Sequence, residues 1–268
     1  MEPIVIAYDN APTENTEFFI DSLKKNKWNY KLIGVGDTWQ NFVKTRVTAY
    51  LHELSQLPDE QLVVLSDARD VVCLRPPNYF KDGFLSFGRN IIVSMELFCE
   101  GQMDETKVTK KIQCVPLTKY WNYYSKQDRP NRKFANMGLL TGYANDLRHL
   151  LSWIIENNYT DDQLGLCNYM NTFPERSAAD VNAELLHTSG FAINCGTLHL
   201  KVQSPDSPSL SELLGAGAFF LHIPGHAISK GQKFVYDAVV HMLKDLNGKK
   251  LTDAYGYSPL KWNEQMLI

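Results

Sequence analysis

The sequence lacks several features that would place it in a well-defined class. No stretch approaches the ~20 consecutive apolar residues of a membrane-spanning helix. No two of its five cysteines form a C-x-x-C pair, which disfavours a zinc site. Basic residues form no stripe, and the net charge is −3, so nothing indicates a nucleic-acid surface. We therefore expect neither a membrane span nor a nucleic-acid partner.

The amino-terminus and the cysteines bear on the compartment. The first ten residues carry no basic leader and only a short apolar run, so they do not look like a secretory signal peptide. The cysteines are odd in number and widely spaced, which is typical of buried, reduced thiols. These features predict a cytoplasmic protein.

The 268 residues, of which 44% are apolar, suffice for one large domain. Apolar runs at residues 4–7, 28–33 and 62–65 alternate with amphipathic segments at 18–23 and 44–57. This order predicts an α/β fold in which a parallel sheet is joined by helical crossovers. We expect further strands at residues 90–96, 134–144, 185–195 and 218–222, and helices capped by Asn145 and Thr160. The domain would span residues 1–230, with a helix and tail at 231–268 packing on it. The polar stretch 97–133 is long enough for a lid or binding loop.

Two acids, Asp67 and Asp70, directly follow the buried strand expected at residues 62–65. Ligands in open α/β sheets collect at the carboxyl ends of such strands. Neighbouring carboxylates repel each other unless a cation lies between them. An oxygen-rich cluster suits Mg2+ or Mn2+, and such an ion can hold a diphosphate. The alternative is structural: an Asp at this place is often a turn former or helix cap, and Arg69 could pair with either acid.

Other polar or aromatic residues also end strands, and each has two interpretations. Tyr8 could stack on a nucleotide base or pack within its loop. Glu96 could face a ligand or be a structural carboxylate. His222 could be a structural histidine or a metal ligand beside the two acids. The spacing Gly34-x-Gly36 does not fit the dinucleotide-binding fingerprint.

Asp161 and Asp162 stand at the expected start of a helix. Thr160 and Gln163 have the spacing of a capping box, with Thr160 as the N-cap and Gln163 at the third helical position. Acids favour the first helical turn, which gives both aspartates a structural explanation. The same arrangement would leave at least one of them exposed at a fixed position, as a catalytic base requires.

Six segments between residues 3 and 227 form an ordered set of motifs. They are Gly34-Val35-Gly36-Asp37-Thr38-Trp39, Val64-Leu65-Ser66-Asp67-Ala68-Arg69-Asp70, Ser94-Met95-Glu96-Leu97-Phe98-Cys99, Asn136-Met137-Gly138-Leu139-Leu140-Thr141-Gly142, Asp161-Asp162-Gln163 and Leu221-His222. Taken in this order, the segments resemble the glycosyltransferase domain of the procollagen lysyl hydroxylases and the related collagen galactosyltransferase-like proteins. Each segment is weak alone, but six in the same order are fairly specific.

The resemblance implies a GT-A fold, a Rossmann-like, mostly parallel mixed sheet flanked by helices. It implies a hexosyl- or pentosyltransferase that uses a nucleotide sugar, UDP-linked as the first expectation, and Mn2+ or else Mg2+. The implied metal ligands are Asp67, Asp70 and His222. The implied donor site comprises Tyr8, Trp39, Lys44, Asp67, Asn136 and Gly138, and the acceptor region includes Glu96. Asp161 or Asp162 would take the proton of a hydroxyl on a glycan or glycoprotein acceptor, in an inverting displacement; retention stays the alternative.

Departures from the family pattern concern the acceptor side. Cys99-Glu100-Gly101 replaces an aromatic residue and a proline, and a long insertion follows. A small stand-alone member of this kind fits glycan assembly in a microbe or a large virus. Two alternatives stay open: a nucleotidyltransferase, which normally carries a Gly-rich basic loop that residues 8–16 do not offer, and a glycan- or nucleotide-binding module without turnover.

Overall fold

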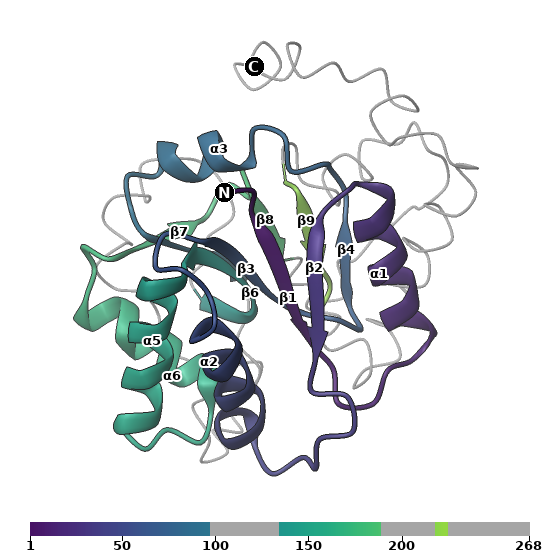
Figure 1. Ribbon diagram of the computed structural model, residues 1–268. Coiled ribbons are helices and arrows are strands. Elements are labelled where there is room, and N and C mark those ends of the chain that lie inside the picture. Colours follow the sequence, from purple (N-terminus) through teal and green to yellow (C-terminus); the bar gives the residue numbers. More distant parts are fainter. Residues whose placement is uncertain (97–133, 189–217, 225–268) are drawn as a thin grey trace, which may run out of the picture.

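A computed structural model describes residues 1–96, 134–188 and 218–224 (Figure 1). The strands are β1 (Ile4–Tyr8), β2 (Asn29–Ile33), β3 (Leu62–Asp67), β4 (Val71–Cys73), β5 (Ile91–Glu96), β6 (Phe134–Tyr143), β7 (Ser177–Asp180), β8 (Leu186–Thr188) and β9 (Phe220–His222). The helices are α1 (Glu14–Lys25), a π-helical segment η1 (Phe42–Val47) that continues into α2 (Thr48–Leu54), α3 (Phe80–Ser86), α5 (Ala144–Glu156) and α6 (Asp162–Thr172). The loop expected at 97–133 and the tail expected at 231–268 lie outside the described residues.

The central sheet has six strands in the order β2-β1-β3-β6-β5-β7. β1 runs parallel to β2 and β3, and β5 runs parallel to β7. β6 is antiparallel to its neighbours β3 and β5. The α/β class is confirmed, and the sheet is mixed but mostly parallel. In the register of β1 and β3, Tyr8 lies opposite Asp67, so the two residues meet at one edge of the sheet.

A second, three-stranded sheet has the order β4-β9-β8. β4 begins directly after the turn that carries Asp70, and it pairs antiparallel with β9 so that Val71 lies opposite His222. The strand expected to end at His222 is therefore confirmed. This pairing joins a residue near the carboxyl end of the chain to the turn after β3.

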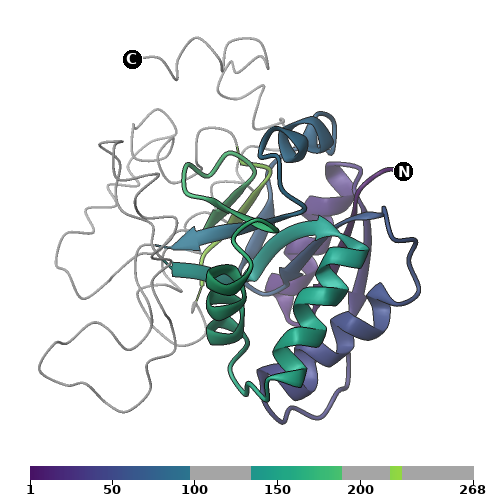
Figure 2. The ribbon, with the colours of Figure 1, turned by 90° about the vertical axis from the view of Figure 1, so that its left-hand side faces the viewer.

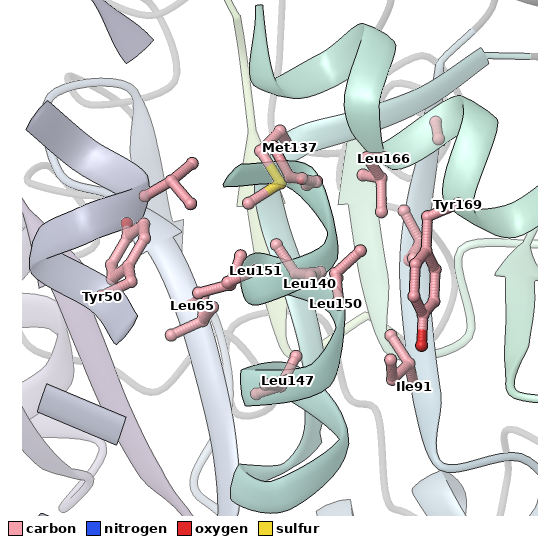
Figure 3. Packing of buried hydrophobic residues seen from close by; sticks show 14 of the residues in the cluster. Tyr50, Leu65, Ile91, Met137, Leu140, Leu147, Leu150, Leu151, Leu166 and Tyr169 are labelled. Carbon is pink, nitrogen blue, oxygen red and sulfur yellow. The ribbon is translucent and has the colours of Figure 1, made fainter. Parts of the chain in front are cut away.

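Alternate side chains of β3 enter two different apolar cores, which explains its uninterrupted apolar run. Val63 and Leu65 belong to a core with α2, α5 and α6, shown close up in Figure 3. Leu62 and Val64 belong to a core with α1, α3 and the small sheet. Figures 1 and 2 show α2, α5 and α6 on one side of the central sheet and α1 on the other. β3 is thus buried on both faces, and its carboxyl end is held firmly in place.

Both predicted helix caps are wrong by one or two residues. α5 begins at Ala144, and its N-cap is Tyr143, the last residue of β6, rather than Asn145. α6 begins at Asp162, and its N-cap is Asp161 rather than Thr160, because the Asp161 Oδ1 accepts the Leu164 N–H at 2.8 Å. Aspartate caps a helix at least as well as threonine, so the capping-box spacing pointed to the wrong residue.

Two further features are the hydropathy of the helices and the state of the cysteines. Within the described part of the chain, no helix is long and apolar enough to cross a membrane. Cys73 and Cys167 are buried free thiols, as expected, and burial raises the pKa of Cys73. The other three cysteines lie outside the described residues.

Asp180 holds the turn between β7 and β8. Its side chain is fully buried and accepts the backbone N–H groups of Glu184, Leu185 and Leu186, each at 2.8 Å. Burial raises the pKa of Asp180 to about 6, although these three hydrogen bonds act to lower it. One carboxyl group therefore fixes the start of β8.

We expect Asp180→Asn to lower the free energy of unfolding by about 1–3 kcal/mol, because the amide NH2 must face a backbone donor in either orientation. The native pKa of about 6 lies above the ordinary value of 3.8. The stability contributed by this group is therefore fully present below the ordinary pKa and is lost as the pH rises through about 6. Denaturant unfolding at low and neutral pH measures both effects.

The loss caused by Asp180→Asn is accordingly expected to be larger at acidic than at neutral pH. Asp82→Asn, at an exposed position on α3, serves as the control and is expected to change little at either pH. A loss that grows toward neutral pH would contradict the raised pKa.

Candidate active site

The three predicted metal ligands lie together where the two sheets meet. Asp67 ends β3, Asp70 lies in the next turn, and His222 ends β9. The His222 Nε2 lies 3.4 Å from the Asp70 Oδ1 and 3.9 Å from the Asp67 Oδ2. One ligand atom from each residue lies within 4.8 Å of the others. Their proximity agrees with the predicted ligand set, and cation binding itself stays a prediction.

The cluster fits a hexacoordinate divalent cation. Two carboxylates and one imidazole are donors that Mn2+ accepts. At metal–ligand distances of about 2.1 Å, adjacent donors of an octahedral ion are ~3 Å apart. The distances of 3.4 and 3.9 Å from the His222 Nε2 are close to that spacing.

Gly138 on β6 supplies bare backbone beside this cluster. A Cβ at this position would lie 2.4 Å from the His222 Cε1 and 2.6 Å from the Asp67 Oδ2. The Gly138 N–H donates to the buried Asn136 Oδ1 at 2.8 Å. Both residues, predicted for the donor site, therefore lie next to the candidate ligands.

The sequence interpretation missed Arg46, which joins two of the predicted site residues. Its Nε and Nη2 donate to the Asp162 Oδ2 at 3.0 and 2.7 Å, and its Nη1 donates to the Asp67 Oδ1. The guanidinium also lies over the Phe42 ring, 5.0 Å from the centroid. Arg46 stands four residues before the buried Tyr50, so its position on the inward face of the helix was the available signal.

Electrostatics keep the Arg46 guanidinium charged. Burial acts to lower the pKa of Arg46, but the charges of Asp162 and Asp67 outweigh it, and the pKa is raised well above the ordinary value. Burial raises the pKa of Asp162, against the opposing effect of Arg46. The guanidinium therefore stays charged, and it balances part of the negative charge at the end of β3.

The structure corrects the expected exposure of the two candidate bases. Asp162 is 2% exposed and bound to Arg46, while Asp161 is half-buried and caps α6. The sequence predicted that at least one of the two would be exposed, and the structure leaves Asp161 half-buried rather than open to solvent. Their catalytic role stays a prediction.

Arg69, suggested as a partner of Asp67 or Asp70, forms its ion pair with Asp9. Its Nε and Nη2 lie 2.9 and 2.5 Å from the Asp9 Oδ1, and Nη2 also donates to the Ala11 carbonyl at 2.9 Å. The Asp9 Oδ2 accepts the Thr16 hydroxyl at 2.5 Å. The turn between the two candidate metal ligands is therefore fastened to the end of β1.

The predicted aromatic residues differ in how much surface they offer. Tyr8 is 6% exposed, and a Cβ at Gly34, whose φ is +83°, would lie 2.2 Å from its ring. Burial, followed by the charge of Asp37, raises the pKa of Tyr8 to about 12. Trp39 is 44% exposed and packs edge-on against Phe42, with ring centroids 5.1 Å apart. Trp39 therefore has free ring surface for stacking, and Tyr8 has little.

Lys44 and Glu96 are the two remaining predicted residues. Lys44 is exposed on η1. Glu96 is the last residue of β5 and pairs with Phe134 of β6. The role of Lys44 in the donor site and that of Glu96 in the acceptor region both stay predictions.

Comparison with protein families gives one match over most of the chain. The profile of the PLOD GT domain matches residues 2–191. No curated protein sequence matches the chain.

Solved structures show more distant likenesses. A glycosyltransferase involved in the glycosylation of the major capsid of PBCV-1 is 13% identical, with 90% of this chain and 98% of that chain covered and a TM-score of 0.47. A197 from STIV is 13% identical, with 67% of this chain and 81% of that chain covered and a TM-score of 0.39. The bifunctional glycosyltransferase WbbM is 12% identical, with 83% of this chain and 45% of that chain covered and a TM-score of 0.43. Since these three TM-scores lie below 0.5, family membership rests on the profile match.

We expect Gly138→Ala to abolish stabilisation by a divalent cation, because the added Cβ collides with His222 and Asp67. Gly142→Ala is the matched control: it lies on the same strand, and its Cβ would meet the Asn90 carbonyl at 2.7 Å, away from the cluster. Thermal unfolding with and without Mn2+ should show a cation-dependent rise in the wild type and the control only. An equal rise in Gly138→Ala would speak against this cation position.

Proposed function

Because the chain belongs to the PLOD GT domain family, we propose that it moves a sugar from a UDP-linked donor to a hydroxyl of a glycan or glycoprotein acceptor, using a divalent cation. The observation that carries the metal-dependent part is the cluster of Asp67, Asp70 and His222 at the carboxyl end of β3. The mixed, mostly parallel sheet flanked by helices is the GT-A architecture that the family implies.

The three clustered side chains would hold Mn2+, or else Mg2+. Such an ion, when bound, neutralises the diphosphate and stabilises the charge that develops on the leaving nucleotide. The exposed ring of Trp39 offers a stacking surface for the base, and the exposed Lys44 on η1 would offer a positive charge to the nucleotide. Asn136 and the bare backbone of Gly138 would lie against the donor sugar.

Of the two candidate bases, we favour Asp161. The Asp162 Oδ2 already accepts two hydrogen bonds from Arg46, and the side chain is buried. The Asp161 Oδ1 accepts one backbone hydrogen bond, and its residue is half-buried. Asp161 would therefore accept the proton of the acceptor hydroxyl during an inverting displacement.

Binding can be tested by thermal unfolding with a panel of nucleotides. UDP with Mn2+ is expected to raise the melting temperature, corresponding to ~3 kcal/mol at a hundredfold excess over Kd. Asp70→Asn removes one ligand charge at nearly constant volume and should lose this rise, whereas the exposed Asp82→Asn should keep it. Absence of any nucleotide effect in the wild type would overturn the donor-site assignment.

Turnover can be tested by hydrolysis of UDP-sugars and by transfer to glycan acceptors. Asp161→Asn is expected to lower kcat on the order of 100-fold, the usual effect of removing a general base, while the UDP-dependent rise in melting temperature persists. Nucleotide binding without turnover of any sugar donor would favour the binding-module alternative. An unchanged kcat in Asp161→Asn would remove this residue from the mechanism.

A further inference from the structure

Arg46 lies between the candidate cation site and Asp162. Its side chain is 9% exposed, compared with 3% for Asp162 and 27% for Asp67. Two of its nitrogens bind Asp162, and the third, Nη1, binds Asp67. Because Asp162 takes the Nε–Nη2 edge, the guanidinium plane is fixed and Nη1 is directed at Asp67.

This arrangement divides the two oxygens of Asp67 between different partners. The Oδ1 accepts the hydrogen bond from Arg46. The Oδ2 faces the cluster, 3.9 Å from the His222 Nε2 and 2.6 Å from the place where a Gly138 Cβ would lie. Only one oxygen of Asp67 is therefore presented to a cation between the three candidate ligands.

Carboxylate denticity distinguishes the ions that such a site can accept. Ca2+ takes six to eight oxygen ligands in flexible geometry and often binds carboxylates through both oxygens. Mg2+ requires near-ideal octahedral geometry, and Mn2+ also suits octahedral sites with oxygen ligands. A carboxylate that offers one oxygen favours the smaller six-coordinate ions.

We propose that Arg46, anchored by Asp162, is a positioning residue that keeps Asp67 a one-oxygen ligand and so makes the site select Mn2+ over Ca2+. This inference rests on the cation site proposed above. It also gives Asp162 a role: its carboxylate orients the arginine. The positive charge of Arg46 alone does not produce this selectivity, because the selectivity requires one side chain to bind Asp67 and Asp162 at the same time.

Replacing Arg46 by lysine distinguishes the effect of the positive charge from the effect of the guanidinium geometry. Arg46→Lys keeps the positive charge but replaces the planar, multi-donor guanidinium by a single ammonium, which cannot reproduce the paired contacts. Asp162→Asn keeps the size of the anchor and removes its charge. Both variants should free the Asp67 Oδ1, so both should improve binding of Ca2+ relative to Mn2+.

The experiment is isothermal titration calorimetry of the full chain with Mn2+ alone and Ca2+ alone. For Arg46→Lys we expect the ratio of the Ca2+ Kd to the Mn2+ Kd to fall at least tenfold from the wild-type value. For Asp162→Asn we expect a smaller fall in the same direction. Arg148→Lys is the control, because Arg148 binds Asp59 before the opposite end of β3, and its ratio should not change.

The outcomes separate this inference from the proposed function. A wild type that binds neither ion overturns the cation site, and the positioning role with it. A wild type that binds Mn2+, with an unchanged ratio in both folded variants, overturns the positioning role alone. Should Arg46→Lys fail to melt cooperatively, Asp162→Asn decides the question, since uniform weakening of both ions there indicates a merely structural contact and also overturns the proposal.

Discussion

Negative charge at the carboxyl end of β3 is the constraint around which this structure is arranged. Buried or half-buried carboxylates without counter-charges would cost several kcal/mol each. Arg46 faces the group from α2's side of the sheet, and Arg69 lies in the turn between the two acids and binds Asp9. The Asp67 Oδ2 and the Asp70 Oδ1 face the His222 imidazole. A divalent cation would complete this balance, which is the physical reason to regard the cluster as a metal site.

The rigidity of that strand end comes from packing on both faces. Val63 and Leu65 enter one core, and Leu62 and Val64 enter the other, so β3 has no free face on which to shift. The Tyr50 hydroxyl donates to the Ser66 carbonyl at 2.8 Å, which fastens α2 to the strand one residue before Asp67. The apolar cores thus determine where the charged side chains stand.

The sequence predicted those parts of the site in which a local pattern coincides with the chemistry. Asp67 was identifiable because an apolar run breaks directly into acids, and His222 because it ends a short apolar strand. Arg46 was not identified, since single-sequence patterns treat charges as exposed, and only the fold brings Asp162 to it. β7 was missed because its residues, Ser177-Ala178-Ala179-Asp180, are small and lack β-branched or aromatic side chains. The cap of α6 was placed one residue early because Thr160 and Asp161 can both cap a helix, and that of α5 was misplaced because the helix follows β6 directly, with Tyr143 as an N-cap that makes no side-chain hydrogen bond.

The candidate ligands come from both sheets: Asp67 ends a strand of the large one, and His222 ends a strand of the small one. Two residues before His222, Phe220 packs on Trp28 and Phe80 of the second core, with ring centroids 4.9 and 6.2 Å apart. A cation bound by all three ligands would therefore act as a cross-link between two layers. Its affinity would report how those layers are seated, so that remodelling of aromatic residues in the second core would tune the site without any change to a ligand.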